Sequence, residues 1–119
     1  MSLGAPDTGQ AGEVNPTEAC TLVGVGAVLV DVRETDEIAQ GHAEGIVAMP
    51  LSLLGDHLDE LPGDRTLVIV CRSGSRSAIA AKALSDAGYT AVNLAGGMEA
   101  WRDAGLAVVR DNGSPGFVA

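Results

Sequence analysis

The sequence lacks the features that mark nucleic-acid-binding and membrane proteins. Its 119 residues carry seven Lys and Arg against sixteen Asp and Glu, with a formal charge of −9 and no basic run. We therefore expect no nucleic acid and no anionic membrane as a partner. The first fifteen residues have neither a basic start nor an apolar run, so we expect no signal peptide, no membrane span and a cytoplasmic protein.

Cysteine is also scarce. Cys20 and Cys71 are the only two, and neither lies in a C-x-x-C or metal-ligand spacing. Two isolated cysteines do not form the disulfide framework of a small secreted domain, so a reducing compartment is the simpler interpretation. We expect no metal and no organic cofactor. Cys20 falls within a predicted helix and is expected to be structural.

Large rings are nearly absent, since aromatic residues make up 3% of the chain and apolar residues 46%. The core must be built from Ala, Val, Leu and Ile, with Trp101 as a packing residue near the end of the chain. The length suits one domain. We expect a flexible arm over 1–14, a domain over 15–108 and a C-terminal tail over 109–119 that frays from Asp111.

Short apolar runs alternate with helical spacing along the chain. We predict strands over 28–30, 46–49, 67–70 and 91–94. Helices are predicted over 16–23, 34–39, 51–61 and 77–87, with a short last helix containing Trp101. This alternation predicts a single-domain α/β fold whose central sheet is mostly parallel, has about five strands and carries helices on both faces.

The segment after the strand 67–70 concentrates polar chemistry. Cys71 follows the strand directly and a helix follows the loop, so backbone amides and the helix dipole favour thiolate over thiol. Arg72 and Arg76 add positive charge, and Gly74 allows the amides to converge on an anion. We expect the anion to be held by this loop and its hydroxyls, from Arg72, Ser73, Gly74, Ser75, Arg76 and Ser77.

The loop Cys71-Arg72-Ser73-Gly74-Ser75-Arg76-Ser77-Ala78 resembles the active-site loop of single-domain rhodanese-like sulfurtransferases. Three further segments match family motifs in the same order: Asp31-Val32-Arg33-Glu34, the stretch from Gly41-His42 to Pro50-Leu51, and Leu94-Ala95-Gly96-Gly97 through Trp101. The likeness spans 15–108 and implies a rhodanese-like fold. Ala43, Ile46 and Ala48 depart from the common pattern without altering this interpretation.

The resemblance implies a two-step transfer through Cys71. The cysteine takes the outer sulfur of thiosulfate or of a glutathione or protein persulfide, becomes a persulfide, and passes the sulfur to cyanide or a thiol, including a protein thiol. Asp31 and Arg33 are expected to support the site as a structural pair. His42 is expected to be a hydrogen-bonded structural residue rather than a proton carrier.

Two other functions remain open from the residues. A phosphatase or arsenate reductase would also place an arginine after a cysteine, but loops of that type are one residue longer than the segment between Cys71 and Arg76. Alternatively, the fold could serve as a non-catalytic interaction module. The intact cysteine favours sulfur transfer over both.

Overall fold

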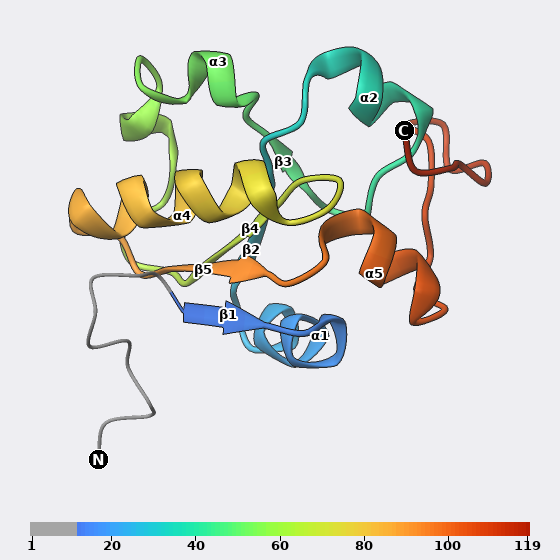
Figure 1. Cartoon of the computed structure of the whole chain (residues 1–119), viewed down its shortest axis with the longest axis horizontal. Coiled ribbons are helices and arrows are strands. Elements are labelled where there is room, and N and C mark those ends of the chain that lie inside the picture. Colours follow the sequence, from blue (N-terminus) through green and yellow to red (C-terminus); the bar gives the residue numbers. More distant parts are fainter. Residues whose placement is uncertain (1–11) are drawn as a thin grey trace.

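The structure, a computed structural model, describes residues 12–119 and is built on one five-stranded sheet (Figure 1). Every pair of neighbouring strands is parallel, in the order β1-β5-β4-β2-β3. The strands are β1 (Gly12–Val14), β2 (Val28–Asp31), β3 (Val47–Ala48), β4 (Leu67–Val70) and β5 (Ala91–Leu94). The predicted α/β class and parallel sheet are confirmed.

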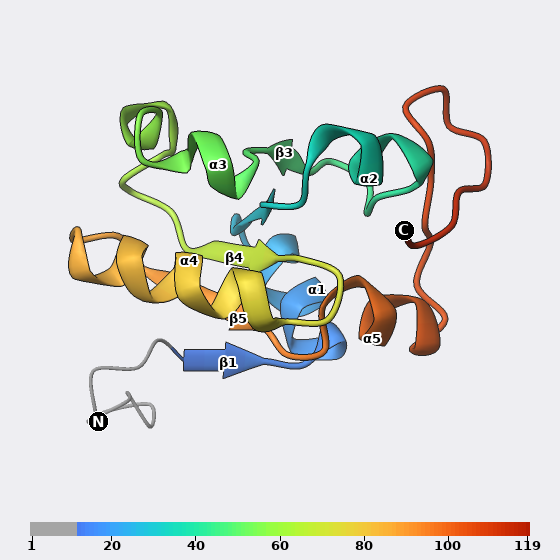
Figure 2. The same cartoon turned by 45° about the horizontal axis from the view of Figure 1, so that its top comes forward.

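Helices cover both faces of the sheet, as the sequence predicts (Figure 2). One face carries α3 and α4, and the other carries α1 and α5, while α2 lies near the end of the sheet where the strands terminate (Figure 1). Among the described residues, none of the helices combines the length and apolarity needed to cross a membrane. The helices are α1 (Pro16–Gly24), α2 (Thr35–Gln40), α3 (Leu51–Leu54), the 3-10 helix η1 (Leu58–Glu60), α4 (Ser75–Asp86) and α5 (Gly97–Asp103).

The central strand β4 explains why the core has two parts. All four of its residues are fully buried, and their side chains alternate between the faces of the sheet. Leu67 and Ile69 join the cluster beneath α3 and α4, while Val68 and Val70 join the cluster beneath α1 and α5. A polar-free strand is suited to this doubly covered position, and it delivers the next residue, Cys71, to the carboxyl edge of the sheet.

The predicted helix over 51–61 is wrong in extent. The chain forms α3 and then η1, with Gly55, Asp56 and His57 between them. Leu54 and Leu61 are nevertheless buried in the core. The leucine spacing therefore identified the buried positions, whereas the glycine and the polar residues after it broke the helix into two short turns.

Both ends of the described chain are more ordered than expected. Most of the expected arm over 1–14 lies outside the described residues, but its last three form β1, because they pair with the open edge of β5. The tail does not fray: His42 and Val109 exchange backbone hydrogen bonds of 2.8 Å, and Phe117 N donates to the Gln40 carbonyl at 3.0 Å. Val118 is buried against the core, which gives the tail an apolar anchor.

Candidate active site

Cys71 sits at the junction of β4 and α4. The loop between them ends at Gly74, whose φ of 104° lies in the left-handed region that glycine adopts without strain. This conformation turns the Gly74 N–H to the Cys71 sulfur at 3.1 Å, and the Ser77 hydroxyl lies 3.2 Å from the same atom. Cys71 is only 1% exposed. Its sulfur is therefore enclosed by the first turn of α4.

These contacts set the ionisation of the thiol. Burial raises the pKa of Cys71, while hydrogen bonds from the Ser77 hydroxyl and from the amides of Ser77, Gly74 and Ser73 lower it. The hydrogen bonds prevail, so the pKa of Cys71 lies below its ordinary value. The enclosed sulfur is consequently more acidic than a free cysteine, although it lies among aliphatic side chains.

The two arginines of the loop are paired with acids. Both terminal nitrogens of Arg76 donate to the Glu37 carboxylate on α2, at 2.7 and 2.8 Å. Arg72 donates to Glu99 on α5 at 3.2 Å. The hydrogen bonds of both arginines go to protein carboxylates, so the donors that contact the sulfur are backbone amides and one hydroxyl. Anion binding by Arg72 and Arg76 stays a prediction. Ser73 and Ser75 have exposed side chains.

Asp31 and Arg33 form a pair away from the sulfur. Both are fully buried, and Arg33 contacts the two carboxylate oxygens of Asp31 at 2.8 to 3.2 Å. Arg33 also donates to the Gly41 carbonyl at 2.8 Å. Neither side chain has a hydrogen bond to Cys71. The pair connects the end of β2 to the residue after α2, as a structural cross-link would.

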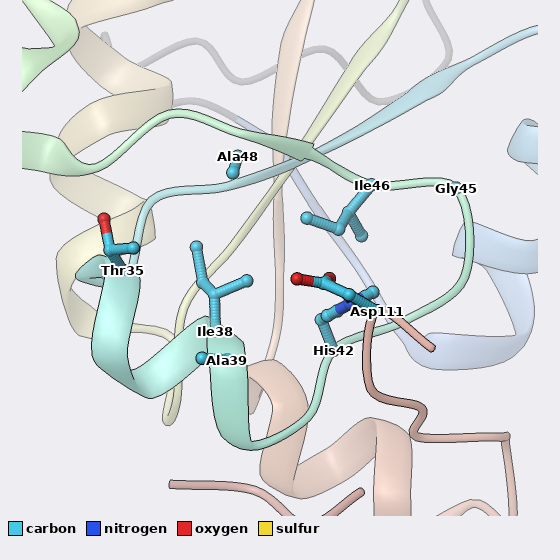
Figure 3. Close-up of a pocket in the computed structure, with 8 residues that line it drawn as sticks. All are labelled: Thr35, Ile38, Ala39, His42, Gly45, Ile46, Ala48 and Asp111. Carbon is cyan, nitrogen blue, oxygen red and sulfur yellow. The ribbon is translucent and has the colours of Figure 1, made fainter. Parts of the chain in front are cut away.

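A cavity of about 310 Å³ lies beside α2, and none of its lining residues comes from the Cys71 loop (Figure 3). His42 and Asp111 face one another at its wall, with Nε2 and Oδ1 2.8 Å apart, and His42 Nδ1 lies 2.8 Å from the Ala43 carbonyl oxygen. His42 is 8% exposed. Both ring nitrogens thus have protein partners, and the ring joins the tail to the domain.

Comparison with known proteins agrees with this geometry. The sequence matches the family described as the rhodanese-like domain over residues 15–104, which is most of the chain. The chain belongs to the rhodanese-like domain family. Within residues 12–119, this rhodanese-like domain has no group of three or more His, Cys, Asp or Glu side chains arranged to hold a metal ion.

Individual relatives of the chain are described as sulfurtransferases or as rhodanese-related proteins. The domain is 44% identical over 87 residues to a sulfurtransferase of Allochromatium vinosum, covering 72% of this chain and 81% of that protein. It is 34% identical over 90 residues to the thiosulfate sulfurtransferase GlpE of Ectopseudomonas mendocina, covering 75% and 83%. A rhodanese-related protein of Thermoplasma volcanium superposes with a TM-score of 0.78 at 28% identity, covering 82% of this chain and 97% of that one.

Glu37 ties α2 of the rhodanese-like domain to α4, and this contact depends on pH. The Arg76 hydrogen bonds lower the pKa of Glu37 from 4.5 to about 2. Since the folded pKa is the lower one, the stabilisation is complete above pH 4.5 and is lost as the pH falls towards 2. Glu37 and Arg76 are 22% and 36% exposed, so solvent screening reduces the gain to about 1 kcal/mol.

We therefore predict that Glu37→Gln lowers the free energy of unfolding by about 1 kcal/mol at pH 7, and that this difference vanishes near pH 2. Urea unfolding across this pH range measures it. Asp86→Asn is the matched control, because Asp86 pairs with Lys82 on an exposed stretch of α4 and should change stability by less than about 0.5 kcal/mol. A Glu37→Gln difference that persists unchanged at pH 2 would contradict the assignment.

A glycine brings α5 against the loop of the rhodanese-like domain. Met98 N donates to the Cys71 carbonyl at 2.8 Å, and Glu99 N donates to the Arg72 carbonyl at 3.0 Å. Gly97 precedes both, with a φ of 58°, and a Cβ on it would lie only 2.4 Å from the Cys71 carbonyl oxygen. No side chain fits this approach, so Gly97 is required for α5 to hold the backbone of Cys71.

We predict that Gly97→Ala destabilises the rhodanese-like domain by about 3 kcal/mol, because left-handed strain and displacement of the Cys71 backbone add together. Thermal unfolding measures the loss. Gly105→Ala isolates the strain, since Gly105 has a φ of 80° but open space around its Cβ, and should cost only about 1 kcal/mol. Equal losses of stability in the two variants would show that the close approach of Gly97 to the Cys71 carbonyl does not contribute to the cost.

Sequence reasoning missed two residues of the rhodanese-like site. Glu37 pairs with Arg76, which lies 39 positions further along the chain, and no local sequence pattern predicts that pairing. Asn93 is buried, lies beside Ser77 and interrupts the apolar strand β5. A lone side-chain amide inside a buried strand needs hydrogen-bond partners. A polar residue within the predicted strand 91–94 therefore could have indicated that Asn93 has a specific role.

Proposed function

We propose that this domain transfers a sulfane sulfur from a small donor to a thiol or cyanide through a persulfide on Cys71. The observation that carries the proposal is the convergence of the Gly74 amide and the Ser77 hydroxyl on the Cys71 sulfur, which lowers the pKa of that thiol. A thiolate is the nucleophile that attacks sulfur. Similarity to sulfurtransferases, including one described as acting on thiosulfate, supports this chemistry.

The transfer consists of two displacements on sulfur. The Cys71 thiolate attacks the outer sulfur of thiosulfate, a new S–S bond forms, and the donor's own S–S bond breaks as sulfite leaves with the electron pair. A glutathione or protein persulfide reacts in the same way and releases a thiolate. An acceptor thiolate or cyanide then attacks the outer sulfur, and Cys71 leaves as a thiolate. No electrons enter or leave the system, so no redox cofactor is needed.

The loop stabilises the anionic Cys71 sulfur. Negative charge is present on this sulfur when the thiolate forms before the first displacement, and it develops again as Cys71 leaves in the second, with the Gly74 amide and the Ser77 hydroxyl within hydrogen-bond distance. The paired arginines add little net charge, because Glu37 and Glu99 neutralise them. A cytoplasmic setting is part of the proposal, since a reducing compartment keeps Cys71 free to take sulfur.

Mass spectrometry of the intact protein tests the proposal. After incubation with thiosulfate or glutathione persulfide, we expect a gain of one sulfur atom, located on the Cys71 peptide and removed by cyanide or glutathione. The Cys20 peptide is the internal control and should remain unmodified. Absence of any gain on Cys71 with every donor, or turnover of an aryl phosphate that requires Cys71, would overturn the proposal.

A further inference from the structure

One buried side-chain amide contacts two of the residues that hydrogen-bond to the Cys71 sulfur. Asn93 is 2% exposed, and its Oδ1 lies 2.5 Å from the Ser77 hydroxyl oxygen. Its Nδ2 donates to the Gly74 carbonyl at 3.1 Å and to Glu13 Oε2 at 3.0 Å. Both of these partners are acceptors, so the nitrogen must face them and the oxygen must face Ser77.

The Ser77 hydroxyl therefore lies between two acceptors. It has a single proton, while Asn93 Oδ1 at 2.5 Å and the Cys71 sulfur at 3.2 Å both lie within reach. When Cys71 is a neutral thiol, its S–H donates to the Ser77 oxygen, and Ser77 donates to Asn93, so every group is satisfied. When Cys71 is a thiolate, Ser77 must turn its proton to the sulfur, and Asn93 Oδ1 loses its donor.

We propose that Asn93 is a positioning residue that controls the ionisation of Cys71 by competing with its sulfur for the single proton of Ser77. The competition is inferred from the distances among Asn93, Ser77 and Cys71. Its role in sulfur transfer rests on the proposed function. In the transfer cycle, the hydroxyl faces the sulfur when Cys71 is anionic, before attack and at discharge. It returns to Asn93 when the Cys71 sulfur is neutral within the persulfide. A hydrogen bond made only in the charged states raises the thiolate fraction before attack and stabilises Cys71 as the leaving group at discharge.

No charged side chain replaces Ser77 as a donor to the sulfur. Among the described residues, no charged side chain has a hydrogen bond to the Cys71 sulfur. Six of those on the surrounding elements form ion pairs: Arg76 with Glu37, Arg72 with Glu99, and Arg33 with Asp31. Glu13 on β1 accepts from Asn93.

Two substitutions of Asn93 separate competition from a structural role. Asn93→Ala removes the acceptor that faces Ser77, whereas Asn93→Asp strengthens it, and both lose the donor to Gly74. The pH midpoint of thiolate formation at Cys71, read from ultraviolet absorbance with Cys20→Ser in every protein, should be higher for Asn93→Asp than for Asn93→Ala. Repeating the pair with Ser77→Ala measures the effect of the added charge alone.

The Cys71 midpoints of Asn93→Asp and Asn93→Ala differ by some number of pH units. We expect this difference to be about one pH unit larger when Ser77 is present than in the Ser77→Ala background. An equal gap in the two backgrounds would overturn the proposal. The readout does not involve sulfur transfer, so a domain that formed no persulfide would refute the proposed function and still leave this comparison decisive.

A measurement on the unaltered Asn93 covers the case in which its variants do not fold. The side-chain amide resonances of Asn93 in the NMR spectrum should titrate with the Cys71 midpoint, because ionisation removes the hydrogen bond at Oδ1. Ser77→Ala should reduce this movement severalfold. Resonances that stay fixed through the midpoint, or that move equally in the two proteins, would overturn the proposal.

Discussion

Replacing Cys71 by serine should lower sulfur transfer by at least ~1,000-fold with every donor. A serine hydroxyl remains protonated near neutral pH, and its oxygen cannot form the S–S bond that holds the transferred sulfur. Hydrogen bonds from Gly74 and Ser77 cannot compensate. They stabilise negative charge on the side chain at position 71, but the attacking atom is then oxygen instead of sulfur. Thiocyanate formation from thiosulfate and cyanide measures the loss.

Cys20→Ser is the matched control for this experiment. Cys20 lies on α1, is half-buried and packs beside the opposite core cluster from Cys71. Its replacement should leave the rate within about twofold of the original, because no group of the loop contacts it. Comparable losses in the two variants would place the chemistry elsewhere and would remove Cys71 as the nucleophile.

Asp31→Ala should cause the largest loss of stability, about 3 to 5 kcal/mol. The substitution leaves the Arg33 guanidinium fully buried without the Asp31 carboxylate, and its remaining hydrogen bonds go to the backbone oxygens of Gly41 at 2.8 Å and Ala119 at 3.4 Å. A buried unpaired charge has lost its hydration without recovering an ionic partner. Urea or thermal unfolding at neutral pH measures the change.

Two comparisons show whether the cost arises from the orphaned charge. Removing both members of the pair, as Asp31→Leu with Arg33→Met, should recover much of the stability, since apolar side chains can replace a buried ion pair at little net cost. Asp86→Ala, which breaks the exposed contact with Lys82, should cost less than about 0.5 kcal/mol. A double variant as unstable as Asp31→Ala would show that lost packing, rather than the charge, sets the penalty.

The parts of this protein that sequence predicts best are contiguous. The strand 67–70, Cys71, the loop and the following helix lie in one stretch, so the position of the cysteine at the carboxyl edge of the sheet follows from local pattern alone. The alternation of strands and helices likewise predicts the parallel sheet, because crossover rules leave few other arrangements. The fold class and the position of Cys71 at the edge of the sheet could therefore be predicted from the sequence.

What the sequence conceals is the choice of partners over long distances. The charges of Arg72 and Arg76 predict anion binding when read locally, yet each arginine meets a carboxylate from another element. Asn93 faces Ser77 because β5 lies beside β4, a register that no single segment encodes. The tail likewise finds α2 and the core through contacts across the whole chain. Such pairings depend on tertiary packing rather than on propensity.

The near-complete burial of Cys71 has a consequence for selectivity. Only 1% of the residue is exposed, so a donor or acceptor must reach the sulfur with a narrow end rather than a broad face. Compact molecules, and the slender thiol or persulfide end of a larger one, fit such an approach better than bulky oxidants do. Such a site selects its substrates by size and shape as well as by reactivity. Its burial also protects an acidic thiol from oxidation between reaction cycles.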